Sequence, residues 1–163
     1  MTPFQRAMEW ILEAEGPDTN DPNDPGGYTR FGISQKAHPE IDVRQLTPGA
    51  AERIYRKLYW NPIQADSLPP ALAIVLFDAA VNLGVKRGVL LFQEALGVQR
   101  DGIVGSRTVA TARTLGMAIL PSFLRLRARF YVDLADSQPK FRRYLNGWLT
   151  RLFRVQQRAL REV

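Results

Sequence analysis

Residues 3–34 read PFQRAMEWILEAEGPDTNDPNDPGGYTRFGIS, and three local patterns follow one another within this stretch. Residues 3–16 repeat apolar side chains at helical spacing, which predicts an amphipathic helix. Residues 17–27 contain three prolines and two glycines among Asp and Asn, a composition typical of a loop. Residues 28–34 are rich in aromatic and β-branched side chains around one glycine, which predicts a small hairpin.

The apolar stripe of the predicted first helix leads to a carboxylic acid. Phe4, Met8 and Ile11 are followed on the same face by Glu15, whereas Glu13 points elsewhere. Partial burial favours the protonated form of a carboxyl group, which suits a general acid near neutral pH. Glu15 is therefore a candidate catalytic acid; the alternative is an ordinary residue at a frayed helix end.

A second carboxylate, Asp24, follows in the Asp-Pro-Gly-Gly turn, where we expect it to be solvated and ionised. Two carboxyl groups in contrasting environments are the arrangement that glycosidic cleavage requires. Thr29, just after the glycines, offers a hydroxyl group to hold the attacking water. The alternative for Asp24 is a simple turn former.

The same loop concentrates oxygen-bearing side chains, which raises calcium binding as a second interpretation. The run lacks the spacing and the distal glutamate of an EF-hand loop, so we predict no metal site. The residues concerned are Asp18, Asn20, Asp21, Asn23 and Asp24.

The rest of the chain predicts helices separated by short Gly- or Pro-marked turns, over residues 47–59, 70–84, 86–96, 106–115, 119–136 and 139–161. Thr47 and Ser106 are expected N-caps. The helix over 70–84 is apolar on every side, which predicts a buried central helix. Since no linker separates domains, we expect one mainly α domain over residues 1–163, with a small N-terminal hairpin and loop lobe.

Composition limits the classes of function. The 163 residues include no cysteine, so disulfides and thiolate–metal sites are excluded. Acidic residues interrupt the apolar N-terminal stretch, so neither a secretory signal nor a membrane span is expected there. Residues 120–163 carry 10 basic and 3 acidic side chains. This basic region indicates a polyanionic partner (nucleic acid, anionic lipid or an acidic envelope polymer) or a solvated arginine face.

Residues 13–34 resemble the signature of glycoside hydrolase family 108, which runs Glu-Gly, Asn-Asp-Pro-x-Asp-Pro-Gly-Gly-x-Thr and Gly-Ile. The chain departs from this pattern at Pro17 and Arg30, which affects the details of the site's rim. Further likenesses lie in the central-helix motif, in the family's peptidoglycan-binding segment and near the end of the chain, at Asp78–Gly84, Leu96–Gly105 and Gly147–Arg151.

The resemblance implies a lysozyme-like helical fold and a bacteriolytic N-acetylmuramidase, of a kind found among bacteriophage endolysins and bacterial cell-wall enzymes. Such an enzyme hydrolyses the β-1,4 bond between N-acetylmuramic acid and N-acetylglucosamine in bacterial peptidoglycan, without a cofactor. Glu15 matches the family's catalytic glutamate, and Asp24 and Thr29 fall where phage-type lysozymes place their second acid and a threonine. We expect residues 97–112, the peptidoglycan-binding segment, to be integrated in the helical lobe.

The resemblance also implies a biological setting. We expect a monomer that is made in a host bacterial cytoplasm and released through a holin-type pore to lyse the host from the periplasm. The closest enzymatic rival is a lytic transglycosylase. Two non-enzymatic rivals are a peptidoglycan-binding protein without activity and a basic nucleic-acid binder. A nucleic-acid partner is not expected, because it would leave residues 13–34 unexplained.

Several further residues are candidates for substrate contacts. Tyr28 and Asn82 are the predicted sugar-binding residues, although each has a structural interpretation as packing or as a helix fastener. Asp78 and Asn82 form an i, i+4 pair on the predicted buried helix and must find hydrogen-bond partners there. The arginines of the last helix are expected to face anionic glycan or outer-membrane lipid. His38 is assigned no function.

Overall fold

The computed structural model describes residues 1–15, 18 and 28–162. The fold is mainly α-helical with one short antiparallel hairpin, as predicted. The chain divides into two compact units, an N-terminal unit (Met1–Leu58) and a C-terminal unit (Tyr59–Val163). The expected single domain over the whole chain stays a prediction.

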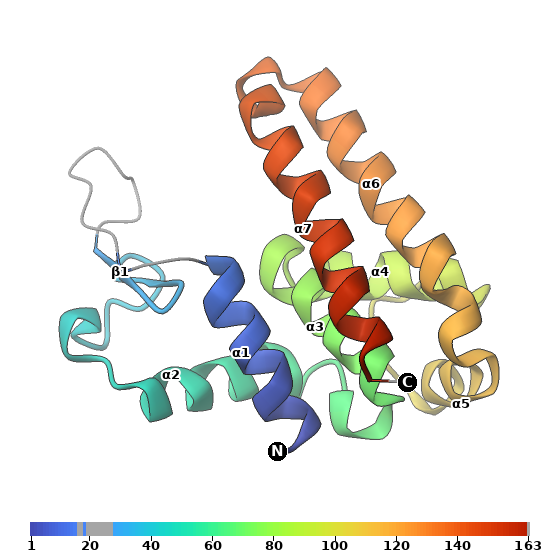
Figure 1. The fold of residues 1–163 in the computed structure, drawn as a ribbon, viewed down its shortest axis with the longest axis horizontal. Helices are drawn as coiled ribbons and strands as arrows, with labels where there is room; N and C mark the ends of the chain where they lie inside the picture. The colour runs from blue at the N-terminus through green and yellow to red at the C-terminus, as the bar shows by residue number, and fades with distance from the viewer. Residues whose placement is uncertain (16–17, 19–27, 163) are drawn as a thin grey trace. The chain divides into compact units, whose positions relative to one another are not determined.

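The described part of the N-terminal unit holds the α-helices α1 and α2 and the hairpin (Figure 1). The strands pair antiparallel, with Thr29 opposite Ser34. The predicted N-cap Thr47 is confirmed, because its side chain accepts a hydrogen bond from the Ala50 N–H at 3.3 Å. The elements are α1 (Pro3–Glu15), β1 (Thr29–Arg30), β2 (Ile33–Ser34), η1 (Val43–Gln45) and α2 (Pro48–Tyr55). A π-helical turn, η2 (Arg56–Trp60), follows and spans the boundary after Leu58.

One face of α1 is buried, as its apolar spacing predicts. Glu13 is exposed, whereas Glu15 at the helix end is half-buried. The stripe therefore does carry Glu15 toward the protein interior. The buried residues of the helix are Phe4, Ala7, Met8, Trp10 and Ile11.

The C-terminal unit is built on α3, whose residues from Ala71 to Ala80 are all buried. This confirms the predicted central helix. The helix packs against α4 and α7, and the α4 contact is close at Gly88, where an added Cβ would lie 3.1 Å from the backbone nitrogen of Ala80. The elements of the unit are η3 (Ala65–Ser67), α3 (Pro70–Leu83), α4 (Val85–Leu96), α5 (Ser106–Leu115), η4 (Gly116–Ile119), α6 (Leu120–Ser137), η5 (Pro139–Phe141) and α7 (Arg142–Leu160).

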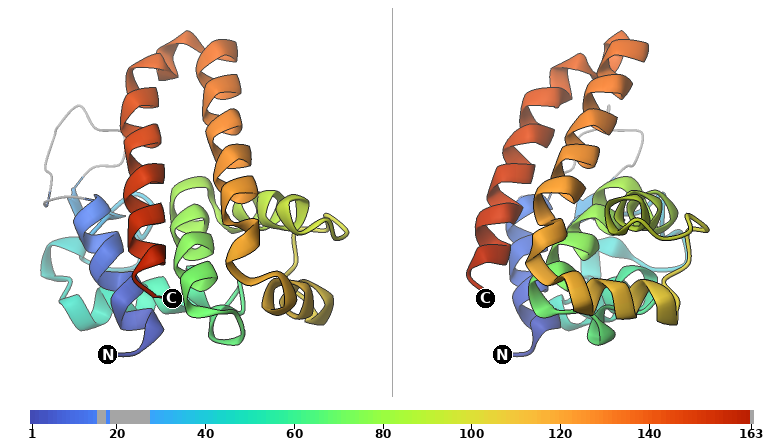
Figure 2. Two further views of the ribbon diagram at one scale, coloured as in Figure 1. Left: turned by 45° about the vertical axis from the view of Figure 1, so that its right-hand side comes forward. Right: turned by 90° about the vertical axis from the view of Figure 1, so that its right-hand side faces the viewer.

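Helices α6 and α7 form a long antiparallel hairpin and lie side by side in both views of Figure 2. A buried ion-pair cluster fastens this hairpin to α3. Within the cluster, the Asp78 carboxylate accepts hydrogen bonds from Arg127 at 2.7 Å and from Arg151 at 2.8 Å. The expectation that buried Asp78 must find partners is thus confirmed. No helix in the described part of the chain is long and apolar enough to cross a membrane.

Residues 97–112 comprise the connection after α4 and most of α5. The side-chain amide of Gln93 holds this connection by hydrogen bonds. The buried Gln93 side chain donates to Asp101 at 2.7 Å and to the Ile103 carbonyl at 2.9 Å, and accepts from the Gly102 N–H at 2.9 Å. The Gln93 hydrogen bond, with one from the Ile103 N–H, lowers the pKa of Asp101. This turn is therefore held by side chains of the C-terminal unit itself.

One predicted cap is wrong. The N-cap of α5 is Gly105, which has no side chain to accept a hydrogen bond, and Ser106 is already the first helical residue. Glycine is tolerated at an N-cap because the position has non-helical backbone angles. The predicted span of the helix is nevertheless confirmed.

Candidate active site

Glu15 is the last residue of α1, and the β-hairpin turn lies directly against its side chain. Gly32 sits at that turn with φ +75°. A Cβ added to Gly32 would lie 2.7 Å from Cγ of Glu15 and 2.5 Å from the Tyr55 hydroxyl oxygen. Because a side chain at position 32 would collide with both residues, a glycine is needed there both for its backbone angle and for this close approach.

Tyr55, at the end of α2, forms the other wall of this contact. Its side chain is buried, and its hydroxyl group donates a hydrogen bond to the Phe31 carbonyl oxygen at 3.0 Å. Phe31 itself has φ +53°, a left-handed backbone conformation that residues other than glycine rarely adopt. The tyrosine therefore holds a strained turn in place against Glu15.

The sequence did not point to Tyr55. It lies in an ordinary amphipathic helix, 24 residues from the carbonyl group that it contacts. A buried tyrosine needs a partner for its hydroxyl group, but the chain's local pattern does not name that partner. Correlated substitutions between position 55 and the Phe31-Gly32 turn, in an alignment of related sequences, are the kind of signal that would have found it.

Charged side chains also fasten the first strand of the hairpin. Arg30 contacts the Asp18 carboxylate at 3.4 Å and donates to the Arg44 carbonyl oxygen at 2.5 Å. The backbone N–H of Phe31 also donates to Asp18, at 3.4 Å. Arg30, where the chain departs from the family pattern, thus fixes the hairpin from outside the contact with Glu15.

Thr29 and Tyr28, the remaining predicted residues of the hairpin, are both half-buried. The Arg44 guanidinium lies 5.3 Å from the centre of the Tyr28 ring, and the Tyr28 carbonyl oxygen accepts a hydrogen bond from the Gln35 N–H at 2.9 Å. Both residues lie close in sequence to the hairpin turn, which contacts Glu15 at Gly32. Their roles with water and sugar stay predictions.

Asp24, the predicted second acid, lies outside the residues that the structure describes. So do most members of the oxygen-rich run that raised calcium binding, of which Asp18 is described and is paired with Arg30. Among the described residues, no three His, Cys, Asp or Glu side chains are grouped to hold a metal ion.

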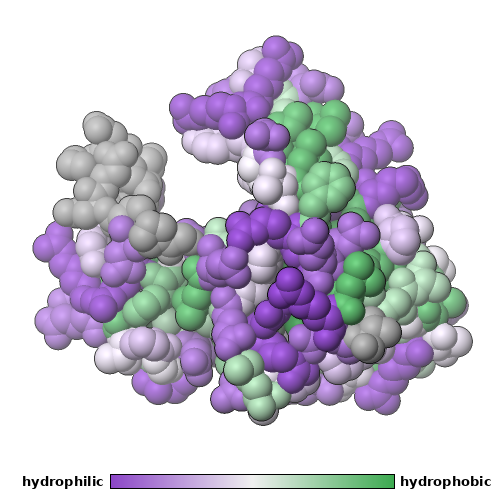
Figure 3. Space-filling view, viewed as in Figure 1, coloured by the Kyte–Doolittle hydropathy of each residue, from purple (hydrophilic) through white to green (hydrophobic). Residues whose placement is uncertain are grey.

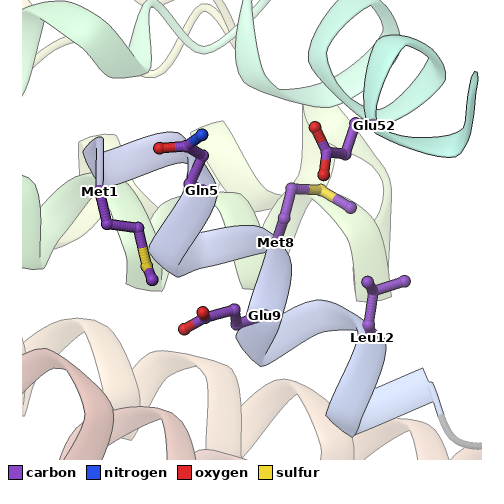
Figure 4. A pocket seen from close by; sticks show the side chains of 6 residues that line it. All are labelled: Met1, Gln5, Met8, Glu9, Leu12 and Glu52. Carbon is purple, nitrogen blue, oxygen red and sulfur yellow. The ribbon is translucent and has the colours of Figure 1, made fainter. Parts of the chain in front are cut away.

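A separate open pocket of about 500 Å³ lies along α1 and α2 in the N-terminal unit (Figure 4). Its polar lining includes Glu9 and Glu52, but Glu15 is not among the lining residues. The candidate site is therefore defined by the hairpin turn at Glu15 rather than by this pocket. The remaining lining residues are Met1, Gln5, Met8 and Leu12.

The predicted sugar contact Asn82 belongs to the C-terminal unit, where its Oδ1 accepts a hydrogen bond from the Tyr131 hydroxyl at 2.5 Å. One turn earlier on α3, burial by itself would raise the pKa of Asp78. The charges of Arg127 and Arg151 and their hydrogen bonds outweigh burial, so the pKa lies below its ordinary value. Asp78 is therefore an ionised structural group, whereas a sugar contact by Asn82 stays a prediction.

Comparison with known proteins covers almost the whole chain. Residues 8–84 match the family model of glycosyl hydrolase 108, and residues 87–153 match a model described as a predicted peptidoglycan domain. The solved structure of Brucella abortus SagA is similar over 97% of this chain and 94% of that chain, with a TM-score of 0.82 and 31% sequence identity. No curated protein matches the chain.

Proposed function

The chain belongs to the glycosyl hydrolase 108 family, and from this premise we propose that it is an N-acetylmuramidase with Glu15 as its general acid. The two matched regions together indicate a glycosidase that acts on peptidoglycan. The finer proposal is hydrolysis of the β-1,4 bond between N-acetylmuramic acid and N-acetylglucosamine. The observation that carries it is the half-buried Glu15 side chain, which lies against a glycine turn that the Tyr55–Phe31 hydrogen bond fastens.

The proposed chemistry divides the work between two carboxyl groups. Glu15 donates its proton to the glycosidic oxygen as the bond to the sugar's anomeric carbon breaks. Asp24 stabilises the positive charge that develops on the sugar or activates the attacking water, and Thr29 orients that water. Water then adds to the anomeric carbon, and its proton passes to the carboxylate that acts as base. These steps use side chains and water and do not call for a cofactor.

The decisive experiment is turnover of purified sacculi by the wild type and by Glu15→Gln. A general acid contributes about 10²- to 10⁴-fold, so we expect the variant to lose activity by that factor while staying folded. Glu13→Gln is the matched control, because Glu13 lies on the same helix but is exposed. Equal activity of Glu15→Gln and the wild type would end the proposal.

The products distinguish the muramidase from its rivals. A muramidase releases new reducing ends of N-acetylmuramic acid, whereas a lytic transglycosylase leaves a 1,6-anhydro sugar, which is lighter by one water. Mass spectrometry of the released fragments separates the two. If the protein binds sacculi and releases neither product, it is a non-catalytic peptidoglycan-binding protein.

We also propose the endolysin setting: synthesis in a host cytoplasm and release through a holin-type pore. The resemblance to phage muramidases supports this proposal. In a Gram-negative host that expresses the protein, lysis should follow only when a pore-forming holin is expressed as well. Lysis without the holin, at equal protein levels, would contradict this route.

A second proposed partner is anionic lipid, and one observation favours it. A groove of about 190 Å³ between α6 and α7 is lined mainly by apolar side chains, among them Leu152 and the 67% exposed Phe153, and Arg125 is also one of its lining residues. The helix α7 carries five arginines and no acidic residue, and four of the five remain once Arg151 is paired with Asp78 in the buried cluster. Figure 3 shows apolar patches among hydrophilic ones along this hairpin. Replacing Arg125 and Arg154 with Gln should weaken binding to phosphatidylglycerol vesicles but not to neutral ones. Unchanged vesicle binding would rule this partner out.

A further inference from the structure

The buried ion-pair cluster of the C-terminal unit continues into a directed chain of hydrogen bonds. Asp78 and Arg127 are both fully buried and 2.7 Å apart. The same Arg127 nitrogen, Nη2, also donates to the hydroxyl oxygen of Tyr131 at 3.2 Å. Because an arginine can only donate, the Tyr131 oxygen must accept here.

The Tyr131 hydroxyl is in turn the donor of the next hydrogen bond. With its oxygen accepting from Arg127, the Tyr131 hydroxyl turns its own proton to Oδ1 of Asn82, 2.5 Å away. The buried Tyr131 ring is itself stacked on Trp148, with centroids 5.1 Å apart and an interplanar angle of 25°. The Asn82 amide is therefore held with its oxygen toward Tyr131 and its NH₂ group turned away.

The NH₂ group of Asn82 is left available. Asn82 is half-buried in the last turn of α3. Within the part of the chain that the structure describes, its Nδ2 makes no hydrogen bond, and it is not among the buried polar atoms that lack a partner. The amide nitrogen therefore reaches solvent and presents two donors in a fixed direction.

Burying the charges of Asp78 and Arg127 costs desolvation free energy, and the network that they form sets the orientation of the Asn82 amide. Apolar side chains would fasten the same three helices about as well, since a buried ion pair gains little net stability over well-packed apolar groups. A half-exposed group with one end fixed by three buried residues is preorganised for a ligand.

We infer that Asn82 is a donor site for the acetamido carbonyl oxygen of the glycan, and that Tyr131 and Arg127 are positioning residues that set the direction of its amide. The inference rests on the proposed function, because it takes a peptidoglycan glycan as ligand. An NH₂ group recognises an oxygen that only accepts, and the acetamido carbonyl is such a group on both sugars of this polymer.

The test is a binding measurement in the Glu15→Gln protein, which does not depend on hydrolysis. The two probes are peptidoglycan glycan strands stripped of stem peptides, in natural form and after chemical de-N-acetylation. With Asn82 intact, we expect the natural strands to bind about tenfold more tightly, which is the effect of one good hydrogen bond. Equal binding of the two strands, or binding of neither, would overturn the inference.

Three variants examine the orientation. Asn82→Asp keeps an acceptor for Tyr131 but loses the NH₂ donors, so the variant should bind acetylated and de-N-acetylated strands about equally. Asn82→Ala should do the same without a new charge, which separates a lost donor from attraction between a carboxylate and the free amines of the modified strands. Tyr131→Phe should lower the preference about threefold, because the amide can then turn over.

Matched substitutions elsewhere on the same unit provide the controls. Asn146→Asp and Tyr144→Phe make the same chemical changes at exposed positions of α7 and should leave the preference unchanged. A preserved preference in both Asn82 variants would refute the contact even if Tyr131→Phe failed to fold. Since binding is measured without turnover, loss of the preference and loss of muramidase activity are separate results.

Discussion

Two polar side chains at the ends of two helices are placed by different physical means. Glu15 at the end of α1 is held by backbone geometry, through a glycine turn and one tyrosine hydroxyl. Asn82 at the end of α3 is held by buried charge, through Asp78, Arg127 and Tyr131. The difference suggests which perturbations each tolerates: the first is sensitive to a single added methyl group, and the second to the loss of a single charge.

The largest effect is expected where the charge is removed. Asp78→Asn leaves Arg127 buried without its counter-charge, which should lower the free energy of unfolding by about 3–5 kcal/mol. Urea unfolding followed by circular dichroism measures it. Asp133→Asn is the control, because its ion pair with Arg129 is exposed and should change stability by less than about 0.5 kcal/mol. Similar losses of unfolding free energy in both variants would show that the buried ion pairs stabilise the protein no more than an exposed one.

Gly32→Ala tests the placement by geometry. Its Cβ would have to displace Glu15 or Tyr55, and a misplacement of this kind costs about 100-fold in kcat. Hydrolysis of sacculi measures this loss. Gly97→Ala is the matched control, because Gly97 also has positive φ (+68°) but no atom lies within 4 Å of an added Cβ. The control should lose stability, roughly 1 kcal/mol, without losing kcat. If both variants kept full kcat, contact at position 32 would not position Glu15.

A smaller change is expected at the tyrosine that holds the turn. Tyr55→Phe removes the hydrogen bond to the Phe31 carbonyl but keeps the ring, so the free energy of unfolding should fall by about 1 kcal/mol. We expect kcat to fall a few-fold while KM stays the same, because the acid is displaced rather than the substrate. A change in KM alone would assign Tyr55 to substrate binding instead.

The smallest effect is a dependence of stability on pH. The Arg127 and Arg151 charges overcome burial and lower the pKa of Asp78 below its ordinary value of 3.8. The unfolded chain therefore takes up a proton at a higher pH than the folded protein does. The contribution of Asp78 is complete above pH 3.8 and is lost as the pH falls below that value. Urea unfolding at a series of acidic pH values should show a slope in the wild type that Asp78→Asn lacks.

Much of the fold could be predicted because local patterns decide it. The helix expected over 70–84 is found as α3 (Pro70–Leu83), since a run that is apolar on every side of a helix and is bounded by proline and glycine has few other solutions. The π-helical turn over Arg56–Trp60 could not be predicted, because it interrupts a pattern that reads as one helix through Tyr59. Ser106 failed as an N-cap because the preceding glycine takes that position.

The candidate site was predictable only in part. Glu15 could be found from its place on a helical stripe, which is a local property of the sequence. Tyr55 and Tyr131 could not, because their partners lie 24 and 49 residues away and are brought near only by tertiary packing. Contacts of this range depend on tertiary packing, of a helix on the hairpin turn for Tyr55 and of α6 on α3 for Tyr131, which residue spacing does not encode.

The Asp78 cluster also bears on how such a protein can be divided or recombined. Asp78 belongs to the region matched as glycosyl hydrolase 108, whereas Arg127 and Arg151 belong to the region matched as a peptidoglycan domain. If the second region were replaced by an unrelated sequence, the Asp78 carboxylate would be buried without its partners. If the first region were replaced, the Arg127 and Arg151 guanidinium groups would lose theirs. The two matched regions therefore do not behave here as separable modules, because one buried ion-pair cluster takes its carboxylate from the first and its guanidinium groups from the second.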